Sequence, residues 1–166
     1  MKKYNEYLEK AMEQLPKGAF LTTQKDGKVN TMTIGWGSFG FAWGIPVFEA
    51  MVRESRFTKA AMDETDVFTV TIPYGEDMKE ALGYCGRISG RDADKIADCN
   101  LTLSKARELE NASVVHCKGL VIECKTVMRL PMQEETTDST ILDEWYKNGD
   151  LHTMYYGEVV ACYEID

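Results

Sequence analysis

The segment RESRFT, from Arg53 to Thr58, is the strongest candidate for binding an anion. It holds two guanidinium groups and two hydroxyl groups within six residues. Arginine forks, hydroxyl donors and the free amides at a helix start together suit a phosphate group, which carries about −1.5 to −2 charges near neutral pH. The same residues also suit a solvated helix start in which Glu49, Glu54 and Asp63 balance the arginines. Both interpretations stay open at this point.

A second cluster of donors is SGRDADK, from Ser89 to Lys95, which combines a hydroxyl, a guanidinium and an ammonium group on a flexible loop. Asp92 and Asp94 could orient these basic groups, and Asp92 could cap a short helix that follows. From spacing alone, a capped helix with surface ion pairs is the simpler interpretation.

The segment GWGSFG, from Gly35 to Gly40, matches the letters of the dinucleotide-binding fingerprint G-x-G-x-x-G. That fingerprint needs a strand before it and a helix that opens on its last glycines. Here Gly44 and Pro46 would interrupt a helix, and the residues after Pro46 favour a strand. We therefore reject a pyrophosphate-binding turn. Either a kinked strand with aromatic side chains in the core or a backbone surface for a flat ring would explain the glycines.

The histidines and cysteines form no recognisable catalytic or metal-binding pattern. The chain has two histidines and five cysteines, and it contains no C-x-x-C. His116 and Cys117 are adjacent but lack a second ligand pair at metal spacing, so we expect a core thiol beside a strand histidine. Cys85 lies near the second donor cluster, but a reactive thiol requires a lowered pKa, which a sequence does not show. We expect no metal site and no catalytic side chain.

The elements that would position these segments include several helices. The first helical pattern places Tyr7, Leu8, Ala11, Met12 and Leu15 on one face, before a break at PKG. The other helical patterns are SRFTKAAMDE with Ser55 as its N-cap, EDMKEALGYCG, a short helix capped by Asp92, and STILDEWYKNGD ended by Gly149.

Strand patterns occupy most of the remaining chain. Asp26 and Gly27 give a hairpin signal between AFLTTQ and VNTMTI. Further strand patterns are VFEAMVRE, VFTVTIP, SVVHCKGLVIECKTVMRL and MYYGEVVACYEI. Strands in hairpin order with helices at the ends and between them predict an α+β fold that is mainly β, with an antiparallel barrel or sheet and flanking helices.

Length and charge limit the class of protein. The 166 residues suggest a single domain over 1–166. The net charge of −8 disfavours nucleic acids and anionic membranes as partners. The chain lacks a signal-peptide core and the apolar run of about 18 residues that a membrane span needs. With its irregularly spaced cysteines, it is expected to be cytoplasmic with reduced thiols.

Four segments read in order resemble the flavin reductase-like family. They are NTMTIGWG at 30–37, VRESRFT at 52–58, YCGRISGRDADK at 84–95 and YYGEVVACY at 155–163. The resemblance covers most of the chain, although 102–132 and the helix around Trp145 are less diagnostic. It implies an FMN-binding split β-barrel and a homodimer with FMN near the subunit interface.

The resemblance also implies which residues hold the flavin. In the family, the N-T-M-T-I segment and the glycines after it lie along the isoalloxazine ring, which implies Asn30, Thr31, Met32, Thr33, Ile34, Gly35 and Trp36. The R-x-S-R-x-T pattern is associated with the phosphate and ribityl chain, which implies Arg53, Ser55, Arg56 and Thr58. The S-G-R-D-x-D-K pattern is a second cofactor-side loop, which implies Ser89, Gly90, Arg91 and Lys95. GWGSFG is then a strand-to-loop bend that borders the flavin.

The activity implied by the resemblance is an FMN-dependent oxidoreductase that passes electrons from NAD(P)H to a flavin or another small acceptor. One alternative is a flavoredoxin-like electron-transfer protein in which a redox protein partner reduces FMN. Another is a non-enzymatic flavin-binding or sensing module. A cofactor that performs the difficult step itself explains why no side-chain acid or base stands out.

Overall fold

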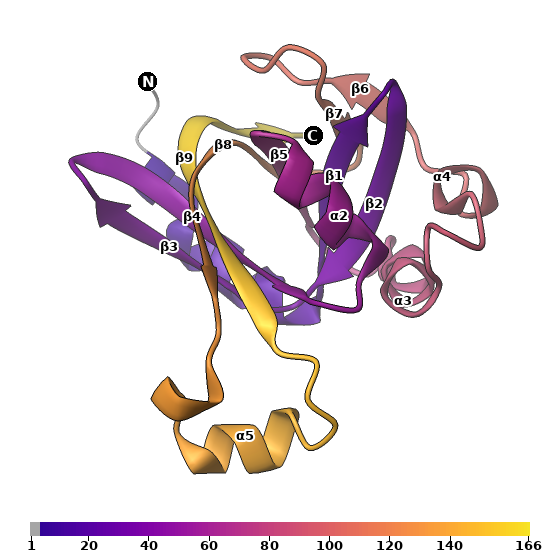
Figure 1. Ribbon diagram of the computed structural model, residues 1–166. Coiled ribbons are helices and arrows are strands. Elements are labelled where there is room, and N and C mark those ends of the chain that lie inside the picture. The colour runs from indigo at the N-terminus through magenta and orange to yellow at the C-terminus, as the bar shows by residue number, and fades with distance from the viewer. Residues whose placement is uncertain (1–3) are drawn as a thin grey trace.

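A computed structural model describes residues 4–166, so the first three residues of the expected 1–166 domain lie outside the described chain. A seven-stranded antiparallel sheet has the order β2-β1-β5-β8-β9-β4-β3 (Figure 1). Its strands are β1 (Ala19–Lys25), β2 (Lys28–Ile34), β3 (Gly37–Ala42), β4 (Ile45–Arg53), β5 (Val67–Pro73), β8 (Gly119–Pro131) and β9 (His152–Ile165). A separate pair is formed by β6 (Leu103–Lys105) and β7 (Ser113–Val115).

The two outer strands of the large sheet are neighbours in the chain. β2 and β3 occupy opposite edges of the sheet, yet only Gly35 and Trp36 connect them. The sheet therefore curls until its edges approach each other without closing by hydrogen bonds. This open, curled sheet with flanking helices confirms the predicted split barrel.

Local sequence explains the turns and the curvature of the sheet. Asp26 and Gly27 have φ of 49° and 76°, as a two-residue hairpin with matching twist requires. β8 and β9 shift register twice, between Glu123 and Cys124 and between Thr126 and Met128, and such bulges bend a strand pair.

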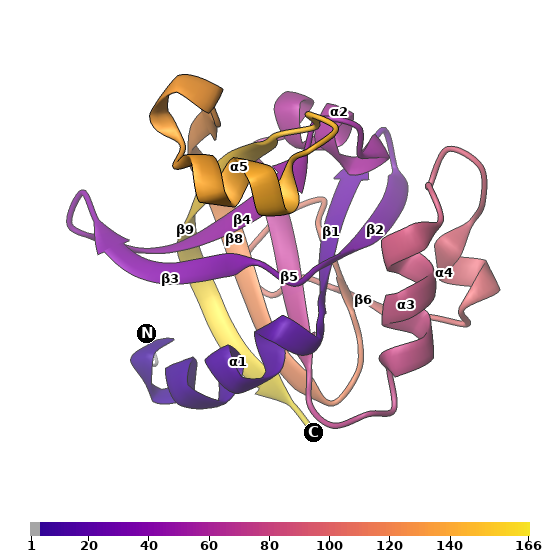
Figure 2. The same cartoon turned by 90° about the horizontal axis from the view of Figure 1, so that it is seen from below.

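Helices flank this sheet. They are the 3-10 helices η1 (Tyr4–Tyr7), η2 (Leu15–Lys17) and η3 (Glu134–Thr136), and the α-helices α1 (Leu8–Gln14), α2 (Phe57–Glu64), α3 (Lys79–Arg87), α4 (Lys95–Asp98) and α5 (Ser139–Trp145). α3 and α4 lie on the side of β2, and α5 projects from the body between the ends of β8 and β9 (Figures 1 and 2). Within residues 4–166, no helix is long and apolar enough to cross a membrane.

The main core fills the inside of the curled sheet. Its largest fully buried side chains include Phe48, Phe68, Ile122 and Tyr155. A smaller cluster joins Phe20 to Leu82, Cys85, Leu101 and Val115, and so packs α3 against the outside of β1. β1 is therefore packed on both faces, with Ala19 and Leu21 in the main core and Phe20 in the smaller cluster.

A buried carboxylate secures the loop between β6 and β7. The Glu123 side chain is fully buried and accepts hydrogen bonds from the backbone N–H groups of Arg107, Glu108 and Leu109 at 2.6 to 3.2 Å. It also accepts one from the Tyr163 hydroxyl at 2.8 Å. Four donors around one carboxylate compensate for its removal from water.

Several local predictions were wrong. Met12 was expected on the buried face of the first helix but is 49% exposed. Ser55 does not cap α2, because its hydroxyl and its backbone N–H both donate to Asp150; Arg56 occupies the N-cap position. Asp94, and not Asp92, caps α4 by accepting from the Ala97 N–H at 3.2 Å.

Candidate functional site

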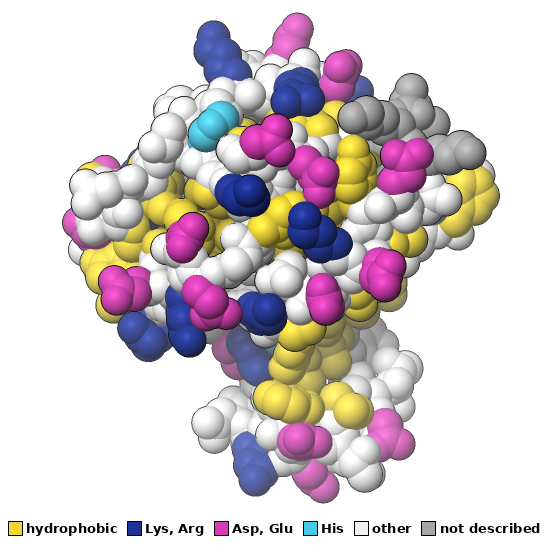
Figure 3. Space-filling model, turned by 180° about the vertical axis from the view of Figure 1, so that it is seen from behind, with side chains coloured by type: hydrophobic (Ala, Val, Ile, Leu, Met, Phe, Trp, Pro, Cys, Tyr) yellow, Lys and Arg dark blue, Asp and Glu magenta, His cyan; other side chains and the backbone are white. Residues whose placement is uncertain are grey.

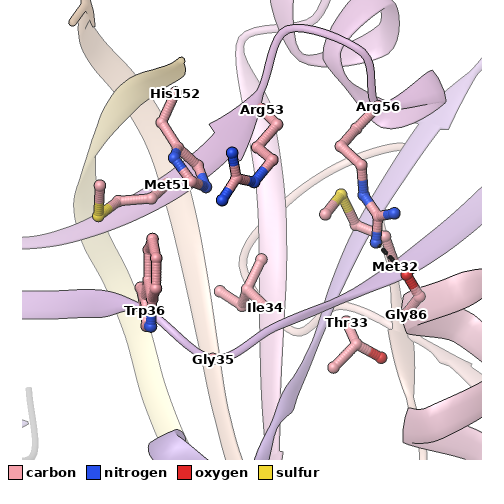
Figure 4. A pocket seen from close by; sticks show the side chains of 10 residues that line it. All are labelled: Met32, Thr33, Ile34, Gly35, Trp36, Met51, Arg53, Arg56, Gly86 and His152. Atoms are coloured by element: carbon pink, nitrogen blue, oxygen red, sulfur yellow. Dashed lines mark hydrogen bonds between the residues drawn. The ribbon is translucent and has the colours of Figure 1, made fainter. Parts of the chain in front are cut away.

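The open edge of the barrel contains a hollow of about 310 Å³, which Figure 4 shows from close by. Arg53, Arg56 and His152 enter it from one side, and Gly35 and Trp36 form the opposite side with Ile34 between (Figure 4). The residues that line it are Met32, Thr33, Ile34, Gly35, Trp36, Met51, Arg53, Arg56, Gly86 and His152. One part of this hollow is therefore cationic and another is apolar.

Of the GWGSFG segment, only Gly35 and Trp36 form the bend at this hollow, since Gly37 to Gly40 already belong to β3. No helix follows Gly40, because β3 continues to Ala42, and this confirms the rejection of a dinucleotide-binding turn. Phe39 packs against the core with its ring centroid 4.9 Å from that of Phe48. Phe41 and Trp43 are 70% and 62% exposed, so they are not core residues.

Arg56 is positioned at the start of α2 with its guanidinium group turned toward α3. Its Nη2 donates to the Gly86 carbonyl oxygen at 2.5 Å. Burial lowers the Arg56 pKa from its ordinary value, Asp150 opposes that shift, and Arg53 adds to it. An arginine keeps its charge under such a shift. The hollow is therefore lined by a partly desolvated cation, and several of its N–H groups are available to a ligand.

Arg53 and Ser55 are tied to the chain that leads into β9. Arg53 donates to the carbonyl oxygens of Asp150 at 2.9 Å and Trp145 at 3.2 Å, and its guanidinium lies 4.9 Å from the centre of the Tyr146 ring. The Ser55 hydroxyl and N–H donate to the two carboxylate oxygens of Asp150 at 2.7 and 2.8 Å. Part of the donor set predicted for a phosphate is thus occupied by Asp150.

A second, smaller hollow of about 90 Å³ adjoins the first and shares Met32 and Arg56 with it. Its lining brings together Met32, Ser55, Arg56, Phe57, Thr58, Arg87, Ile88, Ser89, Gly90 and Lys95. The two donor clusters that are separate in the sequence, 53–58 and 89–95, therefore meet here.

Lys95 supplies the second cation of the smaller hollow. It is 4% exposed, and its ammonium group donates to the Cys85 carbonyl oxygen at 3.4 Å. Burial lowers the Lys95 pKa, nearby Cys85 opposes the shift, and Arg56 adds to it. With Arg56 and Arg87, Lys95 makes three cationic side chains that line this small space, which favours an anion among them.

Gly90 packs closely where the smaller hollow meets β2. A Cβ atom on Gly90 would lie 2.1 Å from Oδ1 of Asn30, so a larger residue there would force the Asn30 side chain to move. The Asn30 amide donates to the Thr58 hydroxyl at 2.8 Å, which ties β2 to α2.

Three residues predicted for the flavin site lie apart from both hollows. Asn30 lies behind the smaller one, as described. The Thr31 side chain is fully buried and donates to the Leu21 carbonyl oxygen at 3.2 Å, so only its backbone can face a ligand. Arg91 lies over the Phe57 ring at 5.6 Å. The individual flavin contacts remain predictions.

Sequence reasoning missed Met51, Gly86 and His152 in the larger hollow, and Phe57, Arg87 and Ile88 in the smaller one. Met51 could have been found, because alternation on a strand places it on the same face as Arg53. His152 carries no such signal, since it reaches the site by pairing with Arg53 across β4 and β9.

His152 is uncharged at neutral pH. Burial lowers its pKa to about 4, and the nearby guanidinium of Arg53 contributes to the shift. Its Nδ1 lies 2.7 Å from the Tyr146 hydroxyl, and its ring centroid is 5.3 Å from that of Trp36. His152 therefore adds a neutral aromatic wall beside the arginines.

Neither Cys85, which lies beside Lys95, nor Cys117 is an activated thiol. Burial raises the pKa of Cys85 to about 12 and that of Cys117 to about 11. Within the described part of the chain, no group of three or more His, Cys, Asp or Glu side chains could hold a metal ion. The site thus consists of two adjoining hollows. The smaller one, lined by hydrogen-bond donors, has the size of a phosphate group, and the larger one has the size of a flat ring system.

The sequence matches the family model described as "Flavin reductase like domain" over residues 12–166. The fold is similar to that of flavoredoxin from Methanosarcina acetivorans, with 26% identity, a TM-score of 0.70 and coverage of 90% of this chain and 68% of that one. Flavoredoxin of Desulfovibrio vulgaris (Miyazaki F) is 20% identical, with a TM-score of 0.69 and coverage of 90% and 69%. An NADH:FAD oxidoreductase of Streptomyces globisporus C-1027 is 14% identical, with a TM-score of 0.66 and coverage of 89% and 75%. No curated protein matches the sequence.

Proposed function

This chain belongs to the flavin reductase-like family, and from that premise we propose that it binds FMN across the two adjoining hollows and uses it for electron transfer. The observation that carries the proposal is the continuity of the lining. A ring-sized hollow and a smaller hollow share Met32 and Arg56, and the cations Arg56 and Lys95 lie at the smaller one. FMN has the same division into a flat ring and a phosphate dianion.

The residues of the site fit FMN by their chemistry. Arg56, Lys95 and the hydroxyl of Ser89 would hold the phosphate, because charge-assisted donors are the strongest partners of a dianion. Ile34, Gly35 and Trp36 would lie against the ring. Gly35 leaves space there, since a Cβ added to it would meet nothing closer than the Pro16 carbonyl oxygen at 3.9 Å.

FMN, when bound, supplies the capacity to accept a hydride or single electrons and to pass them on. The protein contributes orientation and electrostatics. β2 is an edge strand, so backbone groups on its outer side are available to a ligand. Together with the cations Arg53 and Arg56, such N–H groups would stabilise the negative charge that reduction adds to the ring. Trp36 and neutral His152 would shield that side from water.

For the reaction, we propose an oxidoreductase that takes electrons from NAD(P)H and passes them to a flavin or another small acceptor. The family includes enzymes, and an NADH:FAD oxidoreductase shares the fold. A second candidate is an electron-transfer protein reduced by a protein partner, which the 26% identity to a flavoredoxin supports. The net charge of −8 would steer a basic partner, so that association should weaken as salt rises.

We also propose a homodimer located in the cytoplasm. Large apolar side chains at the outer ends of the molecule, among them Phe41, Trp43, Leu130 and Trp145, are 44% to 70% exposed. Figure 3 shows hydrophobic side chains gathered at the neck that joins the α5 projection to the body. Burial of such groups would favour association of two copies. The five cysteines are all free thiols, as a reducing compartment favours. A mass by light scattering that stays that of one chain at every concentration would contradict the dimer.

The central experiment is a titration of purified protein with FMN, followed by flavin fluorescence and absorbance. We expect binding with one FMN per chain. Protein that neither carries nor binds FMN would refute the proposal. Anaerobic addition of NADH or NADPH to the complex then separates the two candidates, because bleaching of the flavin band at turnover rates supports the oxidoreductase. Reduction only by a protein donor, weakened by salt, supports the electron-transfer protein.

A further inference from the structure

Three of the five cysteines gather in the small apolar cluster beside α3 and α4. Cys85 on α3 is fully buried in this cluster, and Cys99 and Cys117 pack against it with partly exposed side chains. The other two cysteines, Cys124 and Cys162, pack in the main core. The smaller cluster therefore holds thiol groups for which the proposed flavin chemistry has no use.

Within this cluster, Cys85 and Cys99 are neighbours, although residues 86–98 separate them in the chain. Burial raises the pKa of Cys85, and Cys99 adds to this rise through its charge and through a hydrogen bond between the two thiols. Cys85 belongs to α3 and Cys99 ends α4, and these helices lie side by side in both views of the ribbon (Figures 1 and 2). Only a local approach of the two side chains is therefore needed to form an S–S bond of about 2.05 Å.

The segment between the two cysteines carries much of the smaller hollow. Residues 86–98, which we call the phosphate loop, include five of the ten residues that line it, namely Arg87, Ile88, Ser89, Gly90 and Lys95. Residues 88–94 belong to no helix or strand, so this part of the loop is held mainly by α3 and α4 at its two ends. A covalent bond between those ends would restrict the opening of the loop.

Lys95 links the thiol pair to the hollow. It is 4% exposed, and its ammonium group donates to the Cys85 carbonyl oxygen at 3.4 Å. Its own carbonyl oxygen accepts from the Cys99 N–H at 3.2 Å. The backbones of both cysteines therefore position the buried cation that lines the smaller hollow.

We propose that Cys85 and Cys99 form a reversible disulfide that closes the phosphate loop and slows the release of FMN. This inference rests on the proposed flavin site. The loop must open for the phosphate to leave, and fixing a loop in its bound conformation strengthens binding because less ordering is required. The oxidised protein then retains FMN as a resident cofactor, whereas the reduced protein exchanges it more readily.

The oxidation is a two-electron step in which a hydroperoxide is the oxidant. The more accessible thiol, Cys99, attacks one oxygen of hydrogen peroxide, the O–O bond breaks, and the products are a sulfenic acid on Cys99 and one water. The Cys85 sulfur then attacks the Cys99 sulfur, the S–O bond breaks, and the hydroxyl leaves with the Cys85 proton as a second water. A dithiol reverses the change by giving two electrons and two protons to the cysteines and becoming a disulfide itself.

The first test treats the purified protein with hydrogen peroxide and maps its disulfides by mass spectrometry of unreduced peptides. We expect a cross-link between Cys85 and Cys99 that dithiothreitol removes. Cys99→Ser should form no cross-link. Cys117→Ser is the matched control, because it removes a thiol of the same cluster and should leave the cross-link in place. The absence of a cross-link in the wild type, or one that joins Cys124 to Cys162, would overturn the proposal.

The second test measures the rate of FMN release, from the recovery of flavin fluorescence after dilution, before and after oxidation. Oxidation should slow release about 3- to 10-fold in the wild type and in Cys117→Ser, the equivalent of one side chain that no longer needs ordering. It should leave the rate unchanged in Cys99→Ser. Release of riboflavin should change less than about 2-fold, because the loop holds the phosphate.

FMN binding by each reduced variant is the check that it is folded. If the reduced wild type binds no FMN, the proposed function fails, and the peptide map still decides whether the thiol pair forms its disulfide. If the disulfide forms but FMN leaves as fast as before or faster, closure of the phosphate loop is refuted. Equal slowing of FMN and riboflavin would also refute it.

Discussion

Replacing Arg56 by alanine should weaken the binding of FMN far more than the binding of riboflavin, which has no phosphate. Arg56 lies at the junction of the ring-sized and phosphate-sized hollows, and its guanidinium is partly buried. It keeps one contact to protein, the Gly86 carbonyl oxygen at 2.5 Å, so its other N–H groups are available to a ligand. Riboflavin and FMN share every other group, and their comparison therefore isolates the phosphate.

The expected size follows from the kind of bond that is lost. A hydrogen bond to a charged group contributes about 1.5–3 kcal/mol, and each 1.4 kcal/mol is tenfold in Kd. We expect the FMN Kd to rise about 10- to 150-fold and the riboflavin Kd to change less than about 3-fold. Arg56 is a cleaner target than Arg53, because Arg53 also holds Asp150 and Trp145, and its loss would disturb that loop.

The assay is quenching of flavin fluorescence with both ligands, at fixed ionic strength because exposed charges are screened by salt. Arg107→Ala is the control, since Arg107 lies 3.5 Å over the Tyr163 ring and lines neither hollow. It should leave both affinities unchanged. Equal losses of FMN and riboflavin in Arg56→Ala, with the protein still folded by circular dichroism, would refute the phosphate assignment.

Two further predictions concern stability. The His152 pKa is about 4 in the folded state and about 6.5 when unfolded, so the unfolded chain binds more protons between these values, and stability should fall by up to about 3 kcal/mol as pH drops from 6.5 to 4. His152→Gln should flatten this dependence in urea titrations, and an unchanged slope would contradict the reasoning. Glu123→Gln should lower the free energy of unfolding by about 2–4 kcal/mol, because an amide cannot accept from all four donors around Glu123. Glu110→Gln, on the exposed part of the same loop, should change it by less than about 0.5 kcal/mol, and similar losses in both variants would exclude the proposed role of Glu123.

The parts of the fold that depend on neighbouring residues could be predicted from the sequence. The Asp26-Gly27 turn and its flanking strands follow from backbone preferences and alternation. A dinucleotide-binding turn at Gly35 could be rejected because Gly44 and Pro46 prevent a helix after Gly40. The four segments that resembled the family also located both donor clusters that the fold brings together.

The predictions that failed depended on residues distant in the chain. Ser55 was expected to cap a helix, but Asp150, which is 95 positions away, takes both of its donors. His152 enters the site because β9 pairs with β4 in a register that places it opposite Arg53. That register cannot be predicted from the residues of the two strands, which lie far apart in the sequence. Thr23 and Ala61 line one further hollow between the β1–β2 hairpin and α2, and nothing in their spacing predicts that they share it.

The segment from Met132 to Leu151, between β8 and β9, forms a projecting limb. Pro131 pairs with Thr153 in the sheet, and the Met132 N–H donates to the His152 carbonyl oxygen at 2.9 Å, so the base of the limb is fixed whatever lies beyond it. Doubling the length of a flexible loop costs only about 0.6 kcal/mol in closure entropy. Its contacts with the barrel include Trp145, whose ring centroid lies 4.9 Å from that of Trp36. Exchanging the limb for a longer or differently shaped one, in evolution or by grafting, would therefore reshape one side of the mouth and would also replace the contacts that Arg53 and Ser55 make with Trp145 and Asp150.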